Sequence, residues 1–231
     1  MADLTVISAG AIRHSVSRVA QLFEREHGPG VILDFAPAPK IRERLLAGDQ
    51  ADVVIASERV LDALGKAAKI VVSSRSVVGC TRMAVMMRKG AVASDLSSAD
   101  AFRRALLEAD AVVYNEGSSG ANAAATLDRL GLRESLGTKI HVARRGADMI
   151  ELVVSHPGRV LALGQLTNVL DQVEKGLAVA LAGLFPDELQ SVTSYELAVC
   201  AGSRDPERAG AFVRAFGSAD TRKLLAAAGL D

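Results

Sequence analysis

Short apolar runs alternate along the chain with stretches in which apolar residues recur every three or four positions. The runs are rich in β-branched residues and predict buried strands at residues 4–8, 31–35 and 52–56. The stretches with helical spacing predict helices at residues 16–27, 41–47 and 60–64. Strands joined by crossover helices predict a parallel sheet that is covered by helices on both faces.

The remainder of the chain repeats this alternation. Asp205 followed by Pro206 predicts a helix start, because aspartate caps a helix and proline fits its first turn. Ser97 and Ser98 open another helix. Further strands are predicted at residues 83–87, 111–114, 139–143, 160–163 and 197–201, and further helices at residues 121–130, 148–154 and 219–228. The fold class is therefore α/β throughout.

Polar and small residues follow several of the predicted strands. In sheets of this kind, ligands bind beyond the carboxyl ends of the strands. Residues 8–11, 36–39 and 56–57 follow the first three strands, so we expect them to meet at one edge. A glycine-rich loop at residues 115–120 and the polar residues at 165–168 follow later strands.

Composition excludes several classes of partner. The chain has 231 residues, which suits two lobes. Its 27 basic and 27 acidic residues balance, so nothing electrostatic favours nucleic acid or an anionic membrane surface. Only 3% of the residues are aromatic and none is Trp, which disfavours a carbohydrate or single-stranded nucleic acid site. No apolar run approaches the roughly 18–20 residues of a membrane helix, so no membrane insertion is expected.

The sequence predicts neither a metal site nor a cofactor site. Its four histidines lack metal-site spacing with Cys, Asp or Glu. The Gly-Ser-Ser-Gly segment at residues 117–120 is not a dinucleotide fingerprint, and no phosphate loop or nucleophile elbow is present. Cys80 and Cys200 lie in apolar runs, which indicates two buried thiols. Whether they form a disulfide depends on geometry that the sequence does not supply.

Several segments, in order along the chain, resemble the type II periplasmic binding proteins, and among them the molybdate-binding-protein-like group. The resemblance spans nearly the whole chain. It is carried by SAGA at residues 8–11, FAPAP at 35–39, AGDQADVVIAS at 47–57, LFPDELQ at 184–190 and GSRDPE at 202–207.

The resemblance implies two Rossmann-like α/β lobes joined by two crossover strands. One lobe would comprise residues 1–80 and 197–231 and the other residues 81–196, with a ligand cleft between them that closes by hinge motion. Cys80 and Cys200 would then lie at the crossovers.

The resemblance also implies a partner and a location. The membrane components of an ABC transporter are the expected partner, and the protein itself is expected to be a monomer. A periplasmic location follows if a signal peptide was removed. Without one, the chain enters its first strand directly and a cytoplasmic location is expected.

The chain departs from the molybdate binders at its ligand loops. Those proteins hold the oxyanion largely with hydroxyl and backbone donors. Here the first loop has Gly10 and Ala11, and the second has Pro37, Ala38 and Pro39. Proline also removes a backbone donor. Molybdate is therefore disfavoured, and a small carboxylate or another oxyanion is expected.

The candidate ligand residues lie around these loops. Arg13 begins a helix whose free N–H groups suit an anion, and its guanidinium can hold a carboxylate in two places. Ser118 or Ser119 can cap a helix or bind an oxyanion. For each candidate, the alternative is an ordinary surface or capping role. The candidates are Gly10, Ala11, Arg13, Ala38, Lys40, Ser57, Thr81, Ser118, Ser119, Gln165 and Asn168.

Two functions from different classes fit these residues. The first is binding of a small anion for transport. The second is isomerisation, since a few proteins resembling this group isomerise unsaturated tricarboxylates such as aconitate. Arg and Lys side chains could stabilise an allylic carbanion while one base, His14, moves a proton. A cytoplasmic ligand sensor is a third alternative.

Overall fold

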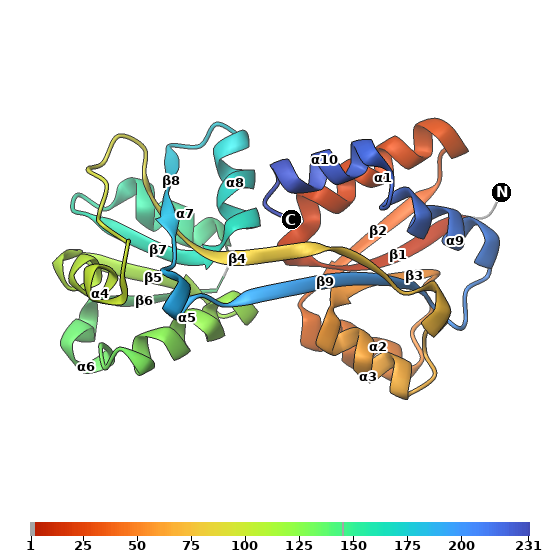
Figure 1. Cartoon of the computed structure of the whole chain (residues 1–231), viewed down its shortest axis with the longest axis horizontal. Helices are drawn as coiled ribbons and strands as arrows, with labels where there is room; N and C mark the ends of the chain where they lie inside the picture. Colours follow the sequence, from red (N-terminus) through yellow and green to blue (C-terminus); the bar gives the residue numbers. More distant parts are fainter. Residues whose placement is uncertain (1–2, 145) are drawn as a thin grey trace. The chain divides into compact units, whose positions relative to one another are not determined.

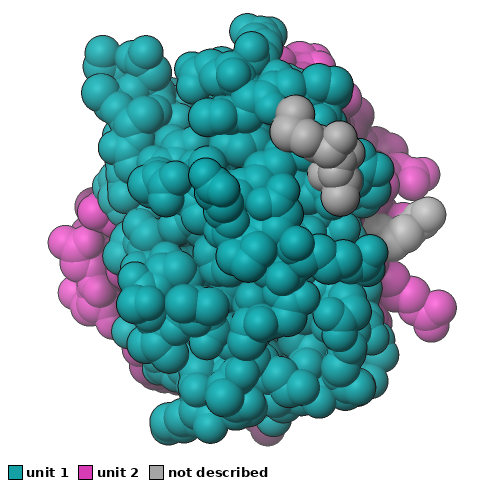
Figure 2. All heavy atoms as spheres, turned by 90° about the vertical axis from the view of Figure 1, so that its right-hand side faces the viewer, with its two compact units in different colours: residues 1–81, 193–231 teal, residues 82–192 magenta. Residues whose placement is uncertain are grey.

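The chain forms two compact units (Figure 2). The computed structural model describes residues 3–144 and 146–231, so Met1, Ala2 and Arg145 lie outside the described residues. Unit 1 comprises residues 1–81 and 193–231, and unit 2 comprises residues 82–192. The chain passes from one unit into the other along two strands, β4 (Ser76–Arg88) and β9 (Val192–Val199).

Unit 1 contains a mixed sheet in the order β2-β1-β3-β9 (Figure 1). Its strand β1 is parallel to β2 and β3, whereas β9 is antiparallel to β3. Because β1, β2 and β3 point the same way, each needs a crossover connection, and a helix follows each of them. The elements are β1 (Leu4–Ala9), η1 (Gly10–Ile12), α1 (Arg13–His27), β2 (Val31–Ala36), α2 (Ala38–Ala47), β3 (Val53–Ser57), α3 (Glu58–Lys66), η2 (Val72–Ser74), α9 (Pro206–Ala215) and α10 (Ala219–Ala227).

Helices cover both faces of the unit 1 sheet. Figure 1 shows α1, α9 and α10 on one face and α2 and α3 on the other. The rings of Phe23 on α1 and Phe212 on α9 meet edge to face, with centroids 5.1 Å apart. Residues 53–56 of β3 are fully buried, as expected for a β-branched run that is covered on both sides.

Unit 2 contains a second mixed sheet, in which β4 lies between β7 and β8. Here β5 is parallel to β6 and β7, whereas β4 is antiparallel to β7 and β8. The elements are α4 (Ala99–Glu108), β5 (Ala111–Asn115), α5 (Ser118–Arg129), α6 (Arg133–Leu136), η3 (Gly137–Lys139), β6 (Ile140–Ala143), α7 (Gly146–Ser155), β7 (Val160–Gln165), α8 (Leu166–Glu174), β8 (Val179–Leu184) and η4 (Asp187–Leu189).

Alternate strand residues of unit 2 face two separate cores. Val85 of β4 packs in one core with Phe102 of α4 and Leu127 of α5. Its neighbour Ala84 packs in the other core with Val153 of α7. This period of two is the geometry of a strand with both faces covered. The predicted α/β class with two lobes and two crossover strands is confirmed.

The structure corrects several predicted boundaries. Strand β4 begins at Ser76 rather than at residue 83, and β8 was not predicted. Helix α5 begins at Ser118, inside the predicted loop. Helix α8 begins at Leu166, so Asn168 lies on a helix and not in a loop. The apolar spacing of Leu166 and Val169 allows this helix to bury one face.

The segment AGDQADVVIAS contains a buried carboxylate that joins three parts of unit 1. Asp52 accepts hydrogen bonds from the Thr5 amide (2.9 Å), the Ser203 hydroxyl (2.8 Å) and the Arg204 amide (2.8 Å). Burial acts to raise the pKa of Asp52, but these hydrogen bonds outweigh it and hold that pKa below its usual value. The segments AGDQADVVIAS and GSRDPE, which both carry the family resemblance, are therefore hydrogen-bonded to each other through Asp52.

In the segment LFPDELQ, Gln190 forms a similar set of hydrogen bonds with the first residues of unit 2. Gln190 accepts from the Met83 amide (2.6 Å) and donates to the carbonyls of Met83 (3.2 Å) and Phe185 (3.1 Å). Phe185 is buried against Phe102, with ring centroids 4.7 Å apart. The local role of this segment is therefore architectural.

Both cysteines are free thiols in the structure. Cys200 is buried, as predicted, whereas Cys80 is only half-buried. Burial raises the pKa of the Cys200 thiol to about 12, so it stays protonated at neutral pH.

Candidate functional site

Three loops of unit 1 meet at one edge of its sheet. Ser8 of β1 lies opposite Phe35 of β2 and Ile55 of β3, and these strands run in the same direction. The residues that follow them, among them Gly10 and Ala38, therefore lie beyond the carboxyl ends of parallel strands. The predicted grouping of these loops is a consequence of the observed register.

Arg13 is held at this edge by an aromatic ring. Its guanidinium carbon lies 4.1 Å from the centroid of the Phe35 ring, a cation–π contact. Arg13 is exposed and forms no ion pair with any described residue. Gly10 and Ala11 precede it in η1, and the space beside Gly10 is open. The half-buried His14 follows it. The guanidinium therefore keeps donors for a ligand.

The second loop offers fewer donors than the first. Helix α2 begins at Ala38, after Pro37 at the N-cap position. Pro39 has no N–H, so the first turn offers only the amides of Ala38 and Lys40. The Lys40 ammonium lies 2.8 Å from the Glu43 carboxylate, and both side chains are exposed. The charge of Lys40 is thus neutralised by a neighbour on its own helix.

Two residues at this edge were not predicted from the sequence. Because β9 is antiparallel to β3, Tyr195 lies opposite Ser57, and Glu196 lies opposite Ala56. Tyr195 and Glu196 are both buried. Ser57 is the N-cap residue of α3, but its side chain does not cap that helix. The sequence offers one signal for this pair, because Tyr195 is one of two tyrosines in a chain with 3% aromatic residues.

The negative charge of Glu196 is compensated from within unit 1. Its carboxylate pairs with Arg75, which also contacts Asp62 at 2.7 Å. The hydrogen bond with Glu196 is the main cause that raises the pKa of Arg75. The carboxylate therefore does not leave an uncompensated negative charge beside Ser57.

In unit 2, the glycine-rich loop is built around Asn115, the last residue of β5. Its side-chain oxygen accepts from the Gly117 amide (2.8 Å) and from the Ser119 hydroxyl (3.3 Å). A Cβ on Gly120 would lie 1.5 Å from the Asn115 carbonyl oxygen, so only glycine fits there. Ser119 is buried and Ser118 is exposed. Of the two alternatives for these serines, capping of α5 does not occur, since Gly117 is the N-cap residue and no side chain caps this helix.

Gln165 and Asn168 follow the neighbouring parallel strand of unit 2. Gln165 is the last residue of β7, lies opposite Met83 of β4 and is buried. It is the N-cap residue of α8, and its side chain does not cap that helix. Asn168 is half-buried in the first turn of α8. Both therefore belong to the carboxyl-end edge of the unit 2 sheet.

Thr81 carries a buried hydroxyl near the end of the unit 1 part of β4. The residue is 1% exposed, and its Oγ1 has no hydrogen-bond partner among the described residues. An unmade hydrogen bond to a buried polar group costs about 1–3 kcal/mol. Such a group is unusual in a folded protein and is a reason to look for a missing partner.

The described helix starts include two kinds. Five helices that follow parallel strands have no side-chain cap, although the first amides of a helix need partners. The N-cap residues of these helices, which are α1, α2, α3, α5 and α8, are Ile12, Pro37, Ser57, Gly117 and Gln165. Elsewhere, Ser98, Asp205 and Ser218 cap α4, α9 and α10. A helix start without a side-chain cap, at the positive end of the helix, favours an anion.

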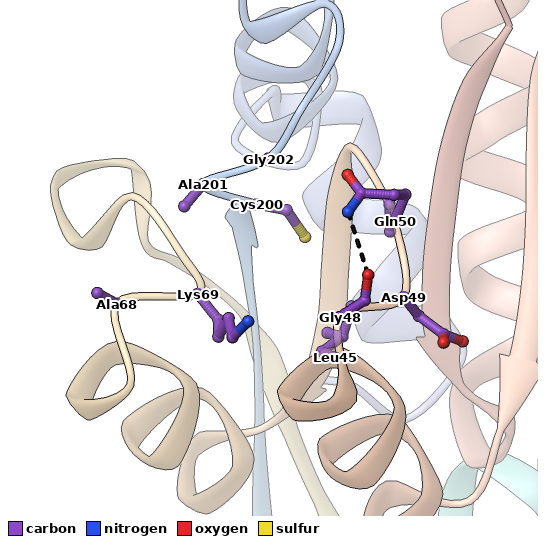
Figure 3. A pocket seen from close by; sticks show the side chains of 10 residues that line it. Leu45, Gly48, Asp49, Gln50, Ala68, Lys69, Cys200, Ala201 and Gly202 are labelled. Carbon is purple, nitrogen blue, oxygen red and sulfur yellow. Dashed lines mark hydrogen bonds between the residues drawn. The ribbon is translucent and has the colours of Figure 1, made fainter.

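One pocket of about 260 Å³ lies at the other end of the unit 1 strands (Figure 3). It lies between the ends of α2 and α3 and is lined in part by Gln50, Lys69 and Cys200. The Gln50 amide donates to the Gly48 carbonyl at 3.1 Å. The protonated Cys200 thiol is not a nucleophile. This pocket is separate from the loops that carry the candidate residues.

Neither a metal site nor a membrane span is found in the described part of the chain. Within residues 3–144 and 146–231, no group of three His, Cys, Asp or Glu side chains could hold a metal ion. In the same ranges, no helix is long and apolar enough to cross a bilayer.

Solved structures share this fold at low sequence identity. The periplasmic molybdate-binding protein of Azotobacter vinelandii matches with a TM-score of 0.78 and 15% identity, covering 99% of each chain. The sulfate-binding protein SubI of Mycobacterium tuberculosis matches with a TM-score of 0.73 and 18% identity, covering 100% of this chain and 86% of that chain. The two α/β units, their two joining strands and these matches show the fold of the type II periplasmic binding proteins.

The particular family follows from the sequence itself. The chain belongs to the bacterial extracellular solute-binding proteins, whose family model it matches over residues 4–231. An aconitate isomerase from a Pseudomonas species is 31% identical over 235 residues, covering 98% of this chain and 87% of that protein. The suspected resemblance to type II periplasmic binding proteins is confirmed.

Proposed function

We propose that this protein binds a small carboxylate or oxyanion at the carboxyl ends of its parallel strands, as the solute-binding component of an ABC transporter. The observation that carries the proposal is the set of uncapped helix starts after parallel strands. Together with Arg13 they supply N–H donors and positive charge in a chain with no net charge. Family membership supports solute binding in the periplasm.

A carboxylate fits these donors better than molybdate does. The second loop has Pro37, Ala38 and Pro39, which supply no hydroxyl and few amides. Arg13, positioned over Phe35, offers a planar pair of donors that matches the two oxygens of a carboxylate. Helix α3 carries Glu58 in its first turn and is the least suited of the three starts in unit 1.

A thermal-shift screen followed by calorimetry tests the ligand class. Citrate, tricarballylate and cis-aconitate are compared with sulfate and molybdate. We expect a carboxylate to stabilise the protein most. Arg13→Ala should weaken its binding by about 1–3 kcal/mol, roughly 5- to 150-fold.

Arg25→Ala is the matched control. Arg25 is an exposed arginine at the other end of α1, so its loss removes the same charge from the same helix. Affinity should not change in this control. Equal affinities of wild type and Arg13→Ala, or preferred binding of molybdate, would contradict the proposal.

Isomerisation of a small unsaturated tricarboxylate is the second candidate function. The observation that favours it is the 31% identity to an aconitate isomerase over nearly the whole chain. His14 would remove a proton from the carbon next to the double bond and return one at the other end of the allylic system, while Arg13 holds a carboxylate. Proton NMR of cis-aconitate in D2O with the protein tests this. Formation of the trans isomer that is lost in His14→Gln supports catalysis, and an unchanged spectrum excludes it.

A further inference from the structure

Arg144 lies one residue beyond the end of β6, next to the glycine-rich loop of unit 2. In the parallel pair of β5 and β6, Asn115 lies opposite Ala143, the last residue of β6. The Glu116 amide donates to the Ala143 carbonyl at 3.1 Å, so the two segments are still hydrogen-bonded where the strands end. Glu116 and Arg144 are the next residues of these two segments. They are therefore neighbours at the carboxyl-end edge of the unit 2 sheet.

The charges of these two residues are opposite, and the structure leaves them unpaired. Both Glu116 and Arg144 are exposed. Neither side chain forms a hydrogen bond or an ion pair with any described residue. By contrast, Arg133 of the same unit pairs with Asp128. One charged donor and one charged acceptor therefore remain for a ligand at this edge.

The surroundings of this pair leave room for a ligand. Helix α5 begins at Ser118 without a side-chain cap, and helix α7 begins at Gly146, two residues after Arg144. A Cβ on Gly146 would meet nothing within 4 Å, so the space beside it is open. The side-chain oxygen of Asn115 already accepts from the Gly117 amide and belongs to the turn itself.

The two charges together place a chemical requirement on the ligand. Arg144 attracts a carboxylate, whereas Glu116 repels it. A ligand benefits from both only if it carries a hydrogen-bond donor beside the carboxylate. A hydroxyl on the carbon next to the carboxylate meets this requirement, because it can donate to Glu116 while the two carboxylate oxygens bind the guanidinium. An ammonium in that place would also donate, but it would cancel a negative charge that uncapped helix starts favour.

We propose that Arg144 and Glu116 determine ligand specificity and select a 2-hydroxycarboxylate. Arg144 binds the carboxylate, and Glu116 accepts a hydrogen bond from the hydroxyl. Glu116 also acts against carboxylates without such a donor, because its own charge then faces theirs without compensation. This assignment rests on the proposed function and names the class of carboxylate that the protein selects.

Calorimetry on the full chain tests the assignment with ligands that differ by one substituent. Citrate is compared with tricarballylate, and L-malate with succinate and L-aspartate. Wild type should bind citrate and malate about tenfold or more tightly than tricarballylate and succinate, as a hydrogen bond to a charged group implies. Glu116→Ala should remove this preference without weakening the binding of tricarballylate. Arg144→Gln should weaken all the carboxylates by about tenfold.

Arg129→Gln and Glu134→Ala are the matched controls. Both residues are exposed and charged, and they lie on α6 and at the far end of α5. Neither control should change an affinity.

Three outcomes would overturn the assignment: equal binding of citrate and tricarballylate by wild type, tighter binding of aspartate than of malate, and a preference for citrate that survives in Glu116→Ala. If carboxylates still bind in those cases and Arg13→Ala weakens them, the proposed function stands without this specificity. If no carboxylate binds to wild type, the proposed function and the assignment fall together.

Discussion

The two ends of the unit 1 sheet differ in whether a side chain accepts hydrogen bonds from the donors found there. At the carboxyl ends of β1, β2 and β3, the helices start without side-chain caps. At the other end, Asp52 accepts hydrogen bonds from the Thr5 amide, the Ser203 hydroxyl and the Arg204 amide. The first end has the donors on which the proposed binding rests, and the second uses its donors to stabilise the fold. The difference distinguishes residues that are proposed to serve binding from residues that serve stability, although both kinds lie in the segments that carry the family resemblance.

The largest expected effect is at Asp52. Asp52→Ala leaves several buried donors without an acceptor, so we expect the free energy of unfolding to fall by roughly 3 kcal/mol, as several lost hydrogen bonds to a charged group imply. Urea unfolding measures this loss. Asp52→Asn keeps one oxygen acceptor and should lose less. If both variants were as stable as wild type, Asp52 would not be a stabilising centre.

The same carboxylate gives a pH dependence. The pKa of Asp52 is held below its usual value in the folded protein, so the unfolded chain binds its proton first as the pH falls. The contribution of Asp52 to stability is therefore present above about pH 4, the value in the unfolded chain, and is lost as the pH falls through the lower folded value. Urea unfolding between pH 6 and pH 3 should show a steeper decline for wild type than for Asp52→Asn. Parallel curves would contradict this assignment.

Thr81 offers a further test of the distinction between binding and stability, because its buried hydroxyl belongs neither to the uncapped helix starts nor to the hydrogen bonds around Asp52. Thr81→Val removes a polar atom that has no hydrogen-bond partner among the described residues. Stability should stay equal or rise by about 1 kcal/mol, while the affinity for the best carboxylate falls by about 1–2 kcal/mol. Thermal unfolding and calorimetry on one preparation give both numbers. A loss of stability with unchanged affinity would assign Thr81 to the fold alone.

The smallest effects compare two serines at helix starts. Ser98 caps α4 through the Ala101 amide (3.2 Å), whereas Ser57 leaves α3 uncapped. Ser98→Ala should cost about 1 kcal/mol of stability and leave ligand affinity unchanged. Ser57→Ala should change stability by less than about 0.5 kcal/mol and weaken ligand binding. Equal stability losses in the two variants would remove the distinction between the two kinds of helix start.

The sequence predicts most of unit 1 because its strands are β-branched runs and its helices have clear apolar stripes. It does not predict β8, whose Val-Ala-Leu-Ala-Gly-Leu sequence lacks both signals. It shortens β4, because Gly79 and Thr81 interrupt the apolar run there and the partner strands of β4 come from distant parts of the chain. These partners are tertiary, and no local pattern contains them.

The candidate site shows the same limit. The edge that collects Gly10, Ala38 and Ser57 follows from topology alone, so the sequence was enough to predict it. Tyr195 and Glu196 depend on the register of an antiparallel strand, which no pattern in the chain fixes. For the glycine-rich loop, the sequence left capping by Ser118 or Ser119 open as an alternative to oxyanion binding, but the side chain of Asn115 bonds that turn instead.

The interruption of unit 1 by unit 2 has a consequence for the order of folding during synthesis. Unit 2 is one continuous stretch, residues 82–192, and can fold while later residues are still being translated. Unit 1 also needs residues 193–231, which are made only after the whole of unit 2. The unit that is begun first is therefore completed last.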